Sequence, residues 1–358
     1  MRASDDFQSQ PVQLICAVDV YQQGISWLWK DWLAKGKLHI LAGQAGTGKT
    51  TLALSLAAII SKGGQFADGL IAKKGSVLIW SGEDGINDTL APRLSAAGSD
   101  LTKIHFIDGY DDNYQKRSFD PATDMPALMM KVQSMADLSL LIIDPIVSAI
   151  SGDGNKNGDV RRGLQPLVDL ASCLNCAVLG ITHLSKGGQG KDPLERVTGS
   201  LAFGAVARVV MIAAKIKDGE NTKRLICRVK SNIGSDEGGF EYHLEQQNTS
   251  TNLVASVAIW DTKLEGSAFS LLGESTYYQD DEYSKSALES AKDFLLDLLV
   301  DGELASLQIR QDAKNSGHSW ATVKRAKEAL NVIASKSKLN NCWYWKLPSY
   351  ILKQVSAK

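Results

Sequence analysis

The sequence predicts an α/β protein with a mostly parallel sheet that carries helices on both faces. Two observations lead to this prediction. Apolar runs of strand length alternate with helical patterns through the first half of the 358 residues, and the apolar run at 38–42 leads directly into a glycine-rich loop at 43–51. Consecutive parallel strands are usually joined by a helix that crosses over the sheet, so the alternation indicates a sheet with helices on both faces.

The expected elements follow one another in a regular order. Strands are expected at 38–42, 76–81, 104–107, 138–143 and 177–182, with helices between them at 50–61, 86–97, 124–136 and 159–174. A further strand is expected at 12–20. After residue 182 the pattern changes. Strands are expected at 206–214, 224–229, 240–244 and 253–260, joined by turns such as Asp218-Gly219 and Gly238-Gly239, so antiparallel strands should extend the sheet.

The loop after the first of these strands is a complete G-x-x-x-x-G-K-T phosphate loop. Its glycines let successive backbone N–H groups turn toward phosphates, at the start of a helix whose dipole favours anions. We expect Lys49 to reach the β- and γ-phosphates of ATP and the Thr50 hydroxyl to hold Mg²⁺. The residues expected to bind the nucleotide are Gly43, Gln44, Ala45, Gly46, Thr47, Gly48, Lys49, Thr50 and Thr51.

Polar residues follow three other expected strands at their carboxyl ends. Asp144 is expected to direct Mg²⁺, with a capping or turn role as the alternative. Glu83 is expected to polarise the attacking water, whereas Asp84 fits the cap of the following helix. His183 is a candidate sensor of the γ-phosphate, with a purely structural histidine as the alternative.

Charge and cysteine usage restrict the setting of the protein. The formal net charge of −1 gives no global sign of nucleic-acid binding, but residues 285–358 carry 12 Lys and Arg against 7 Asp and Glu. This basic tail suggests a polyanionic partner, and a solvated basic face is the alternative. The five scattered cysteines, the acidic N-terminus and the lack of a membrane-length apolar run lead us to expect a cytoplasmic protein without membrane association.

The order of these motifs resembles a known family, the RecA-fold ATPases of the RepA type, which are plasmid- and prophage-encoded relatives of hexameric replicative helicases. The resemblance covers about residues 12–262. It implies a RecA-like P-loop NTPase core that hydrolyses ATP with Mg²⁺, acts on DNA and assembles from identical subunits into a ring. The motifs that carry it are 43–51, Trp80-Ser81-Gly82-Glu83-Asp84, Ile142-Ile143-Asp144-Pro145, 182–186 and 199–208.

The resemblance also assigns roles to individual residues. Glu83 matches the catalytic glutamate, Asp144 the Walker B aspartate and His183 the γ-phosphate sensor of the family. Arg208 matches the position that offers an arginine to the neighbouring subunit's nucleotide. Lys230 matches the first residue of the Lys-x-Arg fingers of DnaB-type helicases, but this chain has Asn at position 232, which departs from the two-finger pattern.

Two loops are expected to contact single-stranded DNA in such a protein. The loop at 151–162 carries Lys156, Arg161 and Arg162, and the loop at 185–196 carries Lys186, Lys191 and Arg196. Flexible basic loops suit backbone tracking along a single strand. Solvated mobile loops are the alternative reading of the same residues.

The C-terminal part resembles a winged-helix or helix-turn-helix domain. Helices are expected at 287–300, 306–314 and 319–330, and Trp343-Tyr344-Trp345 fits a wing strand. Duplex DNA is the expected ligand, contacted by Lys324, Arg325 and Lys327, and a helical protein-interaction domain is the alternative. The expected parts are an N-terminal segment (1–37), the ATPase domain (38–264), a linker (265–284) and the DNA-binding domain (285–358).

Taken together, these features predict a ring-forming replicative helicase of a mobile element, driven by ATP and Mg²⁺. A filament-forming RecA-like recombination or repair ATPase is an alternative within the same enzyme class. A nucleotide-switched DNA-binding regulator without unwinding activity is an alternative from a different class.

Overall fold

The computed structural model describes residues 14–111, 116–184, 193–197, 201–218, 221–249, 251–272, 288–300, 302–316, 318, 320–336 and 343–348. The chain divides into two compact units. The larger unit comprises Met1–Leu184, Pro193–Ala213 and Arg224–Leu271. The smaller unit comprises Ser185–Asp192, Ala214–Lys223 and Leu272–Lys358.

The described strands form a nine-stranded sheet in the order β13-β12-β11-β10-β3-β9-β8-β4-β5. The strands from β10 to β5 pair in parallel, and β12 pairs antiparallel with both of its neighbours. The predicted α/β core, a mostly parallel sheet extended by antiparallel strands, is therefore confirmed. The strands are β3 Leu38–Gly43, β4 Ser76–Ser81, β5 Ile104–Phe106, β8 Leu138–Asp144, β9 Ala177–His183, β10 Val209–Asp218, β11 Asn221–Ser231, β12 Gly239–Asn248 and β13 Val254–Leu264.

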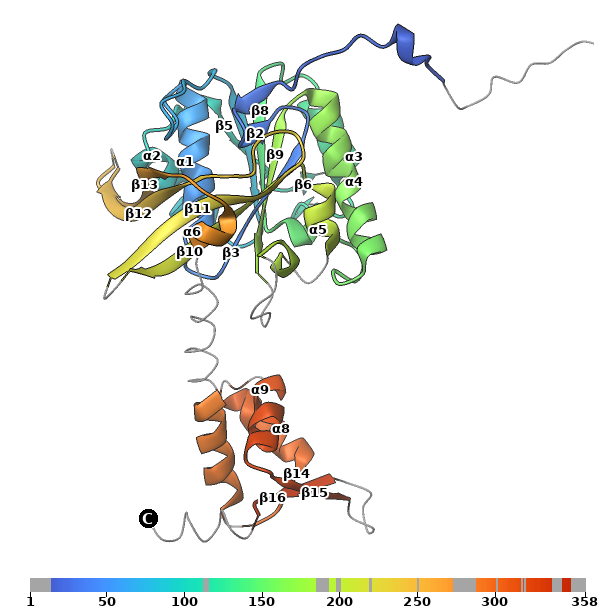
Figure 1. Ribbon diagram of the computed structural model, residues 1–358, viewed down its shortest axis with the longest axis vertical. Helices are drawn as coiled ribbons and strands as arrows, with labels where there is room; N and C mark the ends of the chain where they lie inside the picture. Colours follow the sequence, from blue (N-terminus) through green and yellow to red (C-terminus); the bar gives the residue numbers. More distant parts are fainter. Residues whose placement is uncertain are drawn as a thin grey trace, which may run out of the picture. The chain divides into compact units, whose positions relative to one another are not determined.

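Helices cover both faces of this sheet (Figure 1). Helix α1 packs against β3, β4, β8 and β9, whereas α4 and α5 pack against β3 from the other side. Strand β13 also contacts α1 and α2, so the antiparallel extension curves over the helix that follows the phosphate loop. The helices are α1 Lys49–Lys62, α2 Ala91–Ala96, α3 Met125–Val132, α4 Asn157–Leu174, α5 Leu201–Val206 and α6 Ala268–Leu272.

Several local predictions were wrong. The described part of the strand predicted at 12–20 holds instead a short 3₁₀ helix, Ala17–Asp19, and its apolar side chains are exposed, because no neighbouring strand pairs with them. The helix predicted at 86–97 is split into a turn of π-helix, Ile86–Leu90, and α2, whose first turn contains Pro92. Proline suits a helix start but breaks a helix interior.

Two small hairpins were not predicted. Strands β1 Trp27–Trp29 and β2 Leu33–Ala34 pair just before the phosphate-loop strand, and β6 Tyr110–Asp111 pairs with β7 Lys116–Arg117. Strands of two or three residues are too short to show a period of two.

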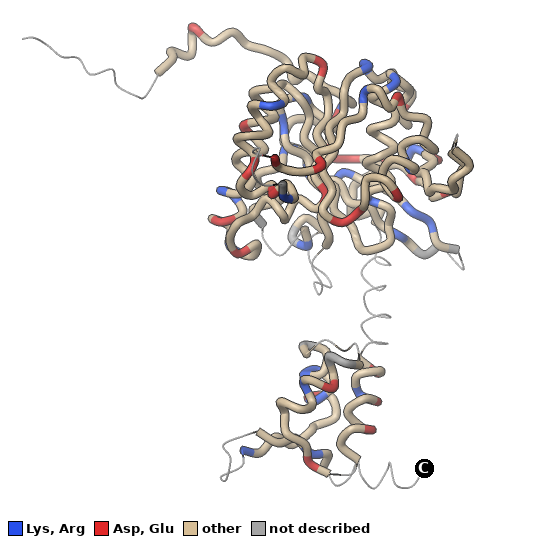
Figure 2. The backbone as a smooth tube through the Cα atoms, turned by 180° about the vertical axis from the view of Figure 1, so that it is seen from behind, with Lys and Arg blue, Asp and Glu red and all other residues tan. Residues whose placement is uncertain are grey.

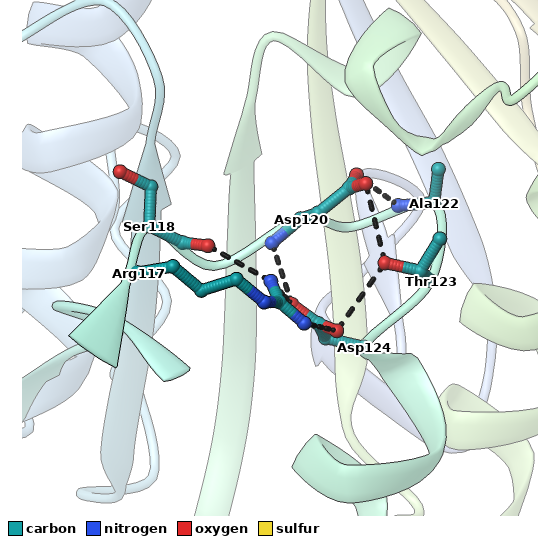
Figure 3. A network of polar contacts seen from close by, with 6 residues as sticks. All are labelled: Arg117, Ser118, Asp120, Ala122, Thr123 and Asp124. Atoms are coloured by element: carbon teal, nitrogen blue, oxygen red, sulfur yellow. Dashed lines mark hydrogen bonds and ion pairs between the residues drawn. The ribbon is translucent and has the colours of Figure 1, made fainter. Parts of the chain in front are cut away.

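A network of polar contacts attaches the β6–β7 hairpin to the start of α3 (Figure 3). Both terminal nitrogens of Arg117 donate to the Asp124 carboxylate at 2.6 Å, and Asp120 N donates to the same group at 2.8 Å. Asp124 is buried, and its hydrogen bonds from Arg117 lower the pKa of its carboxyl group. A bidentate pair of this kind fixes the relative orientation of the two side chains. It therefore holds the start of α3, the helix that precedes β8, to the β6–β7 hairpin.

The core of the larger unit contains a buried titratable group, His39 of β3. Its Nε2 accepts a hydrogen bond from Ala34 N at 2.9 Å, and its Nδ1 lies 3.1 Å from Val178 O. The imidazole is fully buried, and this desolvation lowers its pKa to about 4. The ring therefore links β2, β3 and β9 in its neutral form.

We expect this histidine to make the protein sensitive to acid. The unfolded chain, with a pKa of about 6.5, takes up the proton before the folded chain does, so the contribution of neutral His39 is present above pH 6.5 and is lost toward pH 4. The expected loss is on the order of 3 kcal/mol. Urea unfolding of wild type and His39→Gln between pH 7.5 and 4.5 measures it, because an amide can keep both hydrogen bonds without titrating. Parallel pH profiles of the two proteins would contradict the prediction.

The smaller unit has its own core. A helix at 288–299 is followed by a short strand, two helices and two further strands, and the strands form a sheet in the order β14-β16-β15. Trp320 stacks on Trp345 with ring centroids 5.2 Å apart, and Lys327 Nζ lies 5.1 Å from the Trp345 ring. The elements of this unit are β14 Leu304–Ala305, α8 Ser306–Asn315, α9 Trp320–Ala329, β15 Ile333–Lys336 and β16 Trp343–Lys346.

Across both units, no described helix is long and apolar enough to cross a membrane.

Candidate nucleotide-binding site

The phosphate loop joins β3 to α1, and two of its glycines are required by the backbone. Gly48 caps α1 with φ 93°, a left-handed conformation that glycine adopts without strain. Gly43 lies against β10, where an added Cβ would stand 2.4 Å from Ala213 O. The loop therefore needs glycine both to turn and to pass close to the neighbouring strand.

The sheet register brings the predicted polar residues to one edge. Ser81 of β4 pairs with Asp144 of β8, and Gly43 of β3 pairs with His183 of β9. These positions are all strand carboxyl ends, so the phosphate loop and the polar strand ends lie along the same edge. A hydrogen bond of 2.7 Å from Gly82 N to Asp144 O ties the ends of β4 and β8 together.

Thr50 and Asp144 meet at this edge. The Thr50 hydroxyl donates to Asp144 Oδ2 at 2.7 Å, although the residues lie 94 positions apart in the chain. Asp144 is buried, and desolvation raises the pKa of its carboxyl group to about 6. A hydroxyl and a desolvated carboxylate are hard oxygen donors of the kind that Mg²⁺ prefers, so this pair fits a magnesium ion.

Lys49 connects the loop to the two remaining candidates. Its ammonium group donates to Gln44 O at 3.0 Å and lies 3.2 Å from His183 Nδ1. On the other side of the imidazole, His183 Nε2 lies 3.8 Å from Glu83 Oε1. Burial lowers the pKa of Lys49, and the nearby carboxylates of Asp144 and Glu83 partly oppose this shift. Lys49, His183 and Glu83 thus form a continuous polar chain beside the loop.

The two adjacent carboxylates after β4 have different surroundings. Asp84 accepts a hydrogen bond from Arg93 of α2 at 3.0 Å, so its charge is compensated within the subunit. The Ser81 hydroxyl accepts from the backbone N–H groups of Glu83 and Asp84, at 3.3 and 2.9 Å. Glu83 is half exposed beside His183. The geometry therefore leaves Glu83, rather than Asp84, facing the site.

The family model of the AAA domain named AAA_25 matches residues 9–189, which include the phosphate loop and the strands that end in Ser81, Asp144 and His183. The chain belongs to the AAA_25 family. The match supports a RecA-like ATPase domain. It does not extend to the helicase activity of RepA-type proteins.

Solved structures of two other proteins are similar to the AAA_25 chain. A KaiC-like protein from the hyperthermophilic archaeon Pyrococcus horikoshii OT3 shares 18% identity at a TM-score of 0.43, covering 65% of this chain and 99% of that one. The RadB recombinase shares 15% identity at a TM-score of 0.41, covering 60% of this chain and 89% of that one. No curated protein matches the sequence.

Arg208 and Lys230 lie at the opposite end of the strands from the phosphate loop. Arg208 N donates to Leu38 O at 2.9 Å, which places this exposed arginine at the start of β3 rather than at its phosphate-loop end. Lys230 Nζ donates to Gly204 O at 2.5 Å and to Ala207 O at 2.9 Å, at the end of α5. The ammonium group of Lys230, predicted as a finger, thus binds carbonyls of its own subunit.

The predicted DNA loops are only partly as expected. Arg161 and Arg162 lie within α4 rather than in a loop, and Arg162 pairs with Asp159 at 2.5 Å. Lys156, which precedes α4, is exposed, as are both arginines. Arg196, predicted to contact DNA, is only 6% exposed within the subunit. The predicted contacts Lys186 and Lys191 lie outside the described residues.

Sequence reasoning missed two residues of β12 that contact the phosphate loop. The Tyr242 hydroxyl donates to Thr47 O at 2.6 Å, and the Leu244 side chain packs against Gly48. Nothing local marks these residues, because an aromatic and a leucine in a strand are ordinary core positions. Only the curvature of the antiparallel extension brings them to the loop.

Proposed function

We propose that this protein is a Mg²⁺-dependent ATPase whose site is formed by the phosphate loop and three strand ends. The convergence of Lys49, Thr50, Glu83, Asp144 and His183 at one sheet edge carries this proposal. Lys49 and the loop N–H groups would hold the β- and γ-phosphates, and Thr50 with Asp144 would hold Mg²⁺. The bound ion would neutralise phosphate charge. Glu83 would orient the attacking water and accept its proton, and His183 would sense the γ-phosphate through its contacts with Glu83 and Lys49.

We propose further that Arg208 completes the site of a neighbouring subunit. Parallel strands rise about 3.3 Å per residue, so Arg208, beside Leu38, is on the order of 16 Å from Gly43 along β3. An arginine side chain does not span that distance within one subunit. A ring of identical subunits supplies the arginine in trans, where it would stabilise charge that develops during phosphoryl transfer.

We propose DNA as the polymer on which the ATPase acts, with unwinding by a ring-forming helicase of a mobile element as the activity. The exposed cations Lys156, Arg161 and Arg162 near the strand ends support contact with a phosphate backbone. Figure 2 shows Lys and Arg positions interspersed with Asp and Glu along the backbone of the larger unit.

The decisive measurement is ATP hydrolysis with and without single-stranded DNA. We expect Mg²⁺-dependent hydrolysis that increases when DNA is present, and no hydrolysis by Lys49→Ala, which lacks the buried ammonium group beside the loop. Hydrolysis by Lys49→Ala at the wild-type rate would assign the activity to a contaminant and reject the proposal.

Strand displacement on a forked duplex then separates the candidate functions. Unwinding that requires ATP supports the helicase. Filaments on DNA in electron micrographs, without displacement, would indicate a recombination or repair ATPase. ATP-gated duplex binding without displacement would indicate a regulator.

We also propose that the C-terminal unit binds duplex DNA through α9. Its order of helices and strands, with α8 and α9 ahead of a two-stranded wing, supports a winged-helix domain. Lys324 and Arg325 are exposed and Lys327 is half-buried beside Trp345. The logarithm of the binding constant for duplex DNA falls linearly with the logarithm of the salt concentration. Replacing all three residues by Ala should reduce the steepness of this slope by about 3, roughly 1 for each lost phosphate contact. Lys292→Ala, whose lysine pairs with Glu289, is the control, and equal losses in both variants would contradict this assignment.

A further inference from the structure

We infer that Tyr242 is a positioning residue for nucleotide binding: its hydroxyl holds the phosphate loop in the conformation that receives phosphates. The inference rests on the proposed nucleotide-binding function and extends it to a residue outside the loop and outside the strand ends. It assigns a role in this site to β12, the strand next to the edge of the sheet.

The contact is direct and buried. The Tyr242 hydroxyl donates to Thr47 O at 2.6 Å, across 195 positions of the chain, and the Tyr242 side chain is 2% exposed. Thr47 is fully buried, and its hydroxyl and backbone N–H both donate to Gln44 O. Burial raises the pKa of the Tyr242 phenol, so the hydroxyl keeps its proton and remains a donor.

The direction of this hydrogen bond decides what it does. In a planar trans peptide the C=O and the following N–H point to opposite sides. When Tyr242 holds the Thr47 carbonyl toward β12, the Gly48 N–H of the same peptide unit faces away from β12. In a phosphate loop the backbone N–H groups are the phosphate ligands. Tyr242 therefore fixes the peptide that presents one of these ligands.

A second contact from the same strand supports the loop at the next residue. The Leu244 side chain packs so closely on Gly48 that a Cβ there would lie 3.0 and 3.1 Å from its methyl carbons. Gly48 has φ 93° and precedes the first residue of α1. A hydrogen bond and an apolar contact from alternate residues of β12 thus hold adjacent residues of the loop.

Holding the loop before ligand arrives raises affinity, because a ligand binds only the competent fraction of molecules. Without the Tyr242 hydroxyl, the buried Thr47 carbonyl loses its donor and the peptide can rotate to find another. We expect Tyr242→Phe to weaken binding of Mg²⁺ with the ATP analogue AMP-PNP, and of ADP, by about fivefold to tenfold, the effect of one buried hydrogen bond. The KM for ATP should rise by a similar factor, with kcat within about twofold of wild type, since Glu83, Asp144 and His183 are untouched.

Ser55→Ala provides a matched control. Its hydroxyl accepts from Trp260 Nε1 of β13 at 2.9 Å, so it also joins the antiparallel extension to α1, but it does so away from the loop. Both variants should lose thermal stability, whereas only Tyr242→Phe should lose nucleotide affinity. Calorimetric titration of the full-length proteins with Mg²⁺ and AMP-PNP measures the affinity.

Three results would overturn the inference. Wild-type affinity in Tyr242→Phe would show that the hydroxyl does not preorganise the loop. Equal losses of affinity in Tyr242→Phe and Ser55→Ala would show that general destabilisation accounts for the effect. A wild-type protein that binds neither AMP-PNP nor ADP would overturn the proposed ATPase function as well, so the two failures are distinguishable.

Discussion

Glu83→Gln is expected to lower ATP turnover by roughly 10²- to 10⁴-fold, the usual contribution of a positioned general base. The substitution keeps size and hydrogen bonding but removes the carboxylate that would accept a proton from water. Glu83 is half exposed beside His183 and lies outside the phosphate loop, so binding of Mg²⁺ and AMP-PNP should stay near the wild-type value. Steady-state hydrolysis and calorimetric titration of the same preparation measure both quantities.

The adjacent carboxylate supplies the control for this prediction. Asp84 has the same chemistry and lies one residue away, but it pairs with Arg93 at 3.0 Å. Asp84→Asn should therefore cause a much smaller loss, through the orientation of the loop after β4. If Asp84→Asn lost more turnover than Glu83→Gln, the roles assigned to the two residues would have to be exchanged.

Arg208→Ala is expected to have an effect of comparable or larger size, about 10³- to 10⁵-fold, because an arginine that stabilises the transferring phosphoryl group is worth that much. The side chain is exposed and lies at the sheet edge opposite to its own phosphate loop. Nucleotide binding by the isolated subunit should be unaffected. Hydrolysis per chain by the wild type should rise with protein concentration as subunits assemble.

Mixing two inactive variants tests whether this arginine acts in trans. An Arg208→Ala subunit keeps Glu83, and a Glu83→Gln subunit keeps Arg208, so one kind of junction between them contains both groups. We expect activity to return on mixing. The matched control mixes Arg208→Ala with the double variant Glu83→Gln, Arg208→Ala, which forms no complete junction. Activity in Arg208→Ala alone at the wild-type rate would reject the assignment.

The sequence was sufficient for the parallel half of the fold because its signals are local. Each buried strand is a continuous apolar run, and each helix between strands has its own period, so residues 38–183 could be divided before any contact was known. Boundaries failed where a single residue decides them, as at Pro92, where the predicted helix is split. The unpredicted hairpins β1–β2 and β6–β7 are too short for a period to appear.

The candidate site could be predicted for a related reason. Parallel strands end at one edge of the sheet, so polar residues just after apolar runs, such as Glu83, Asp144 and His183, are expected near a phosphate loop. Both Glu83 and Asp84 follow β4, and the sequence favoured Glu83 only through the expectation that Asp84 caps the next helix. The ion pair with Arg93, which distinguishes them, depends on where α2 packs.

The sequence by itself thus determined the phosphate loop, the α/β class and the set of polar strand ends, because each is written in a few neighbouring residues. Only the tertiary structure decided that Lys230 binds carbonyls at the end of α5, that Arg196 is buried and that Tyr242 supports Thr47. The contacts of Lys230 and Tyr242 join residues 23 to 195 positions apart, and the curvature of the antiparallel strands over α1 produces the longest of them. No local pattern of side chains encodes a distance of that kind.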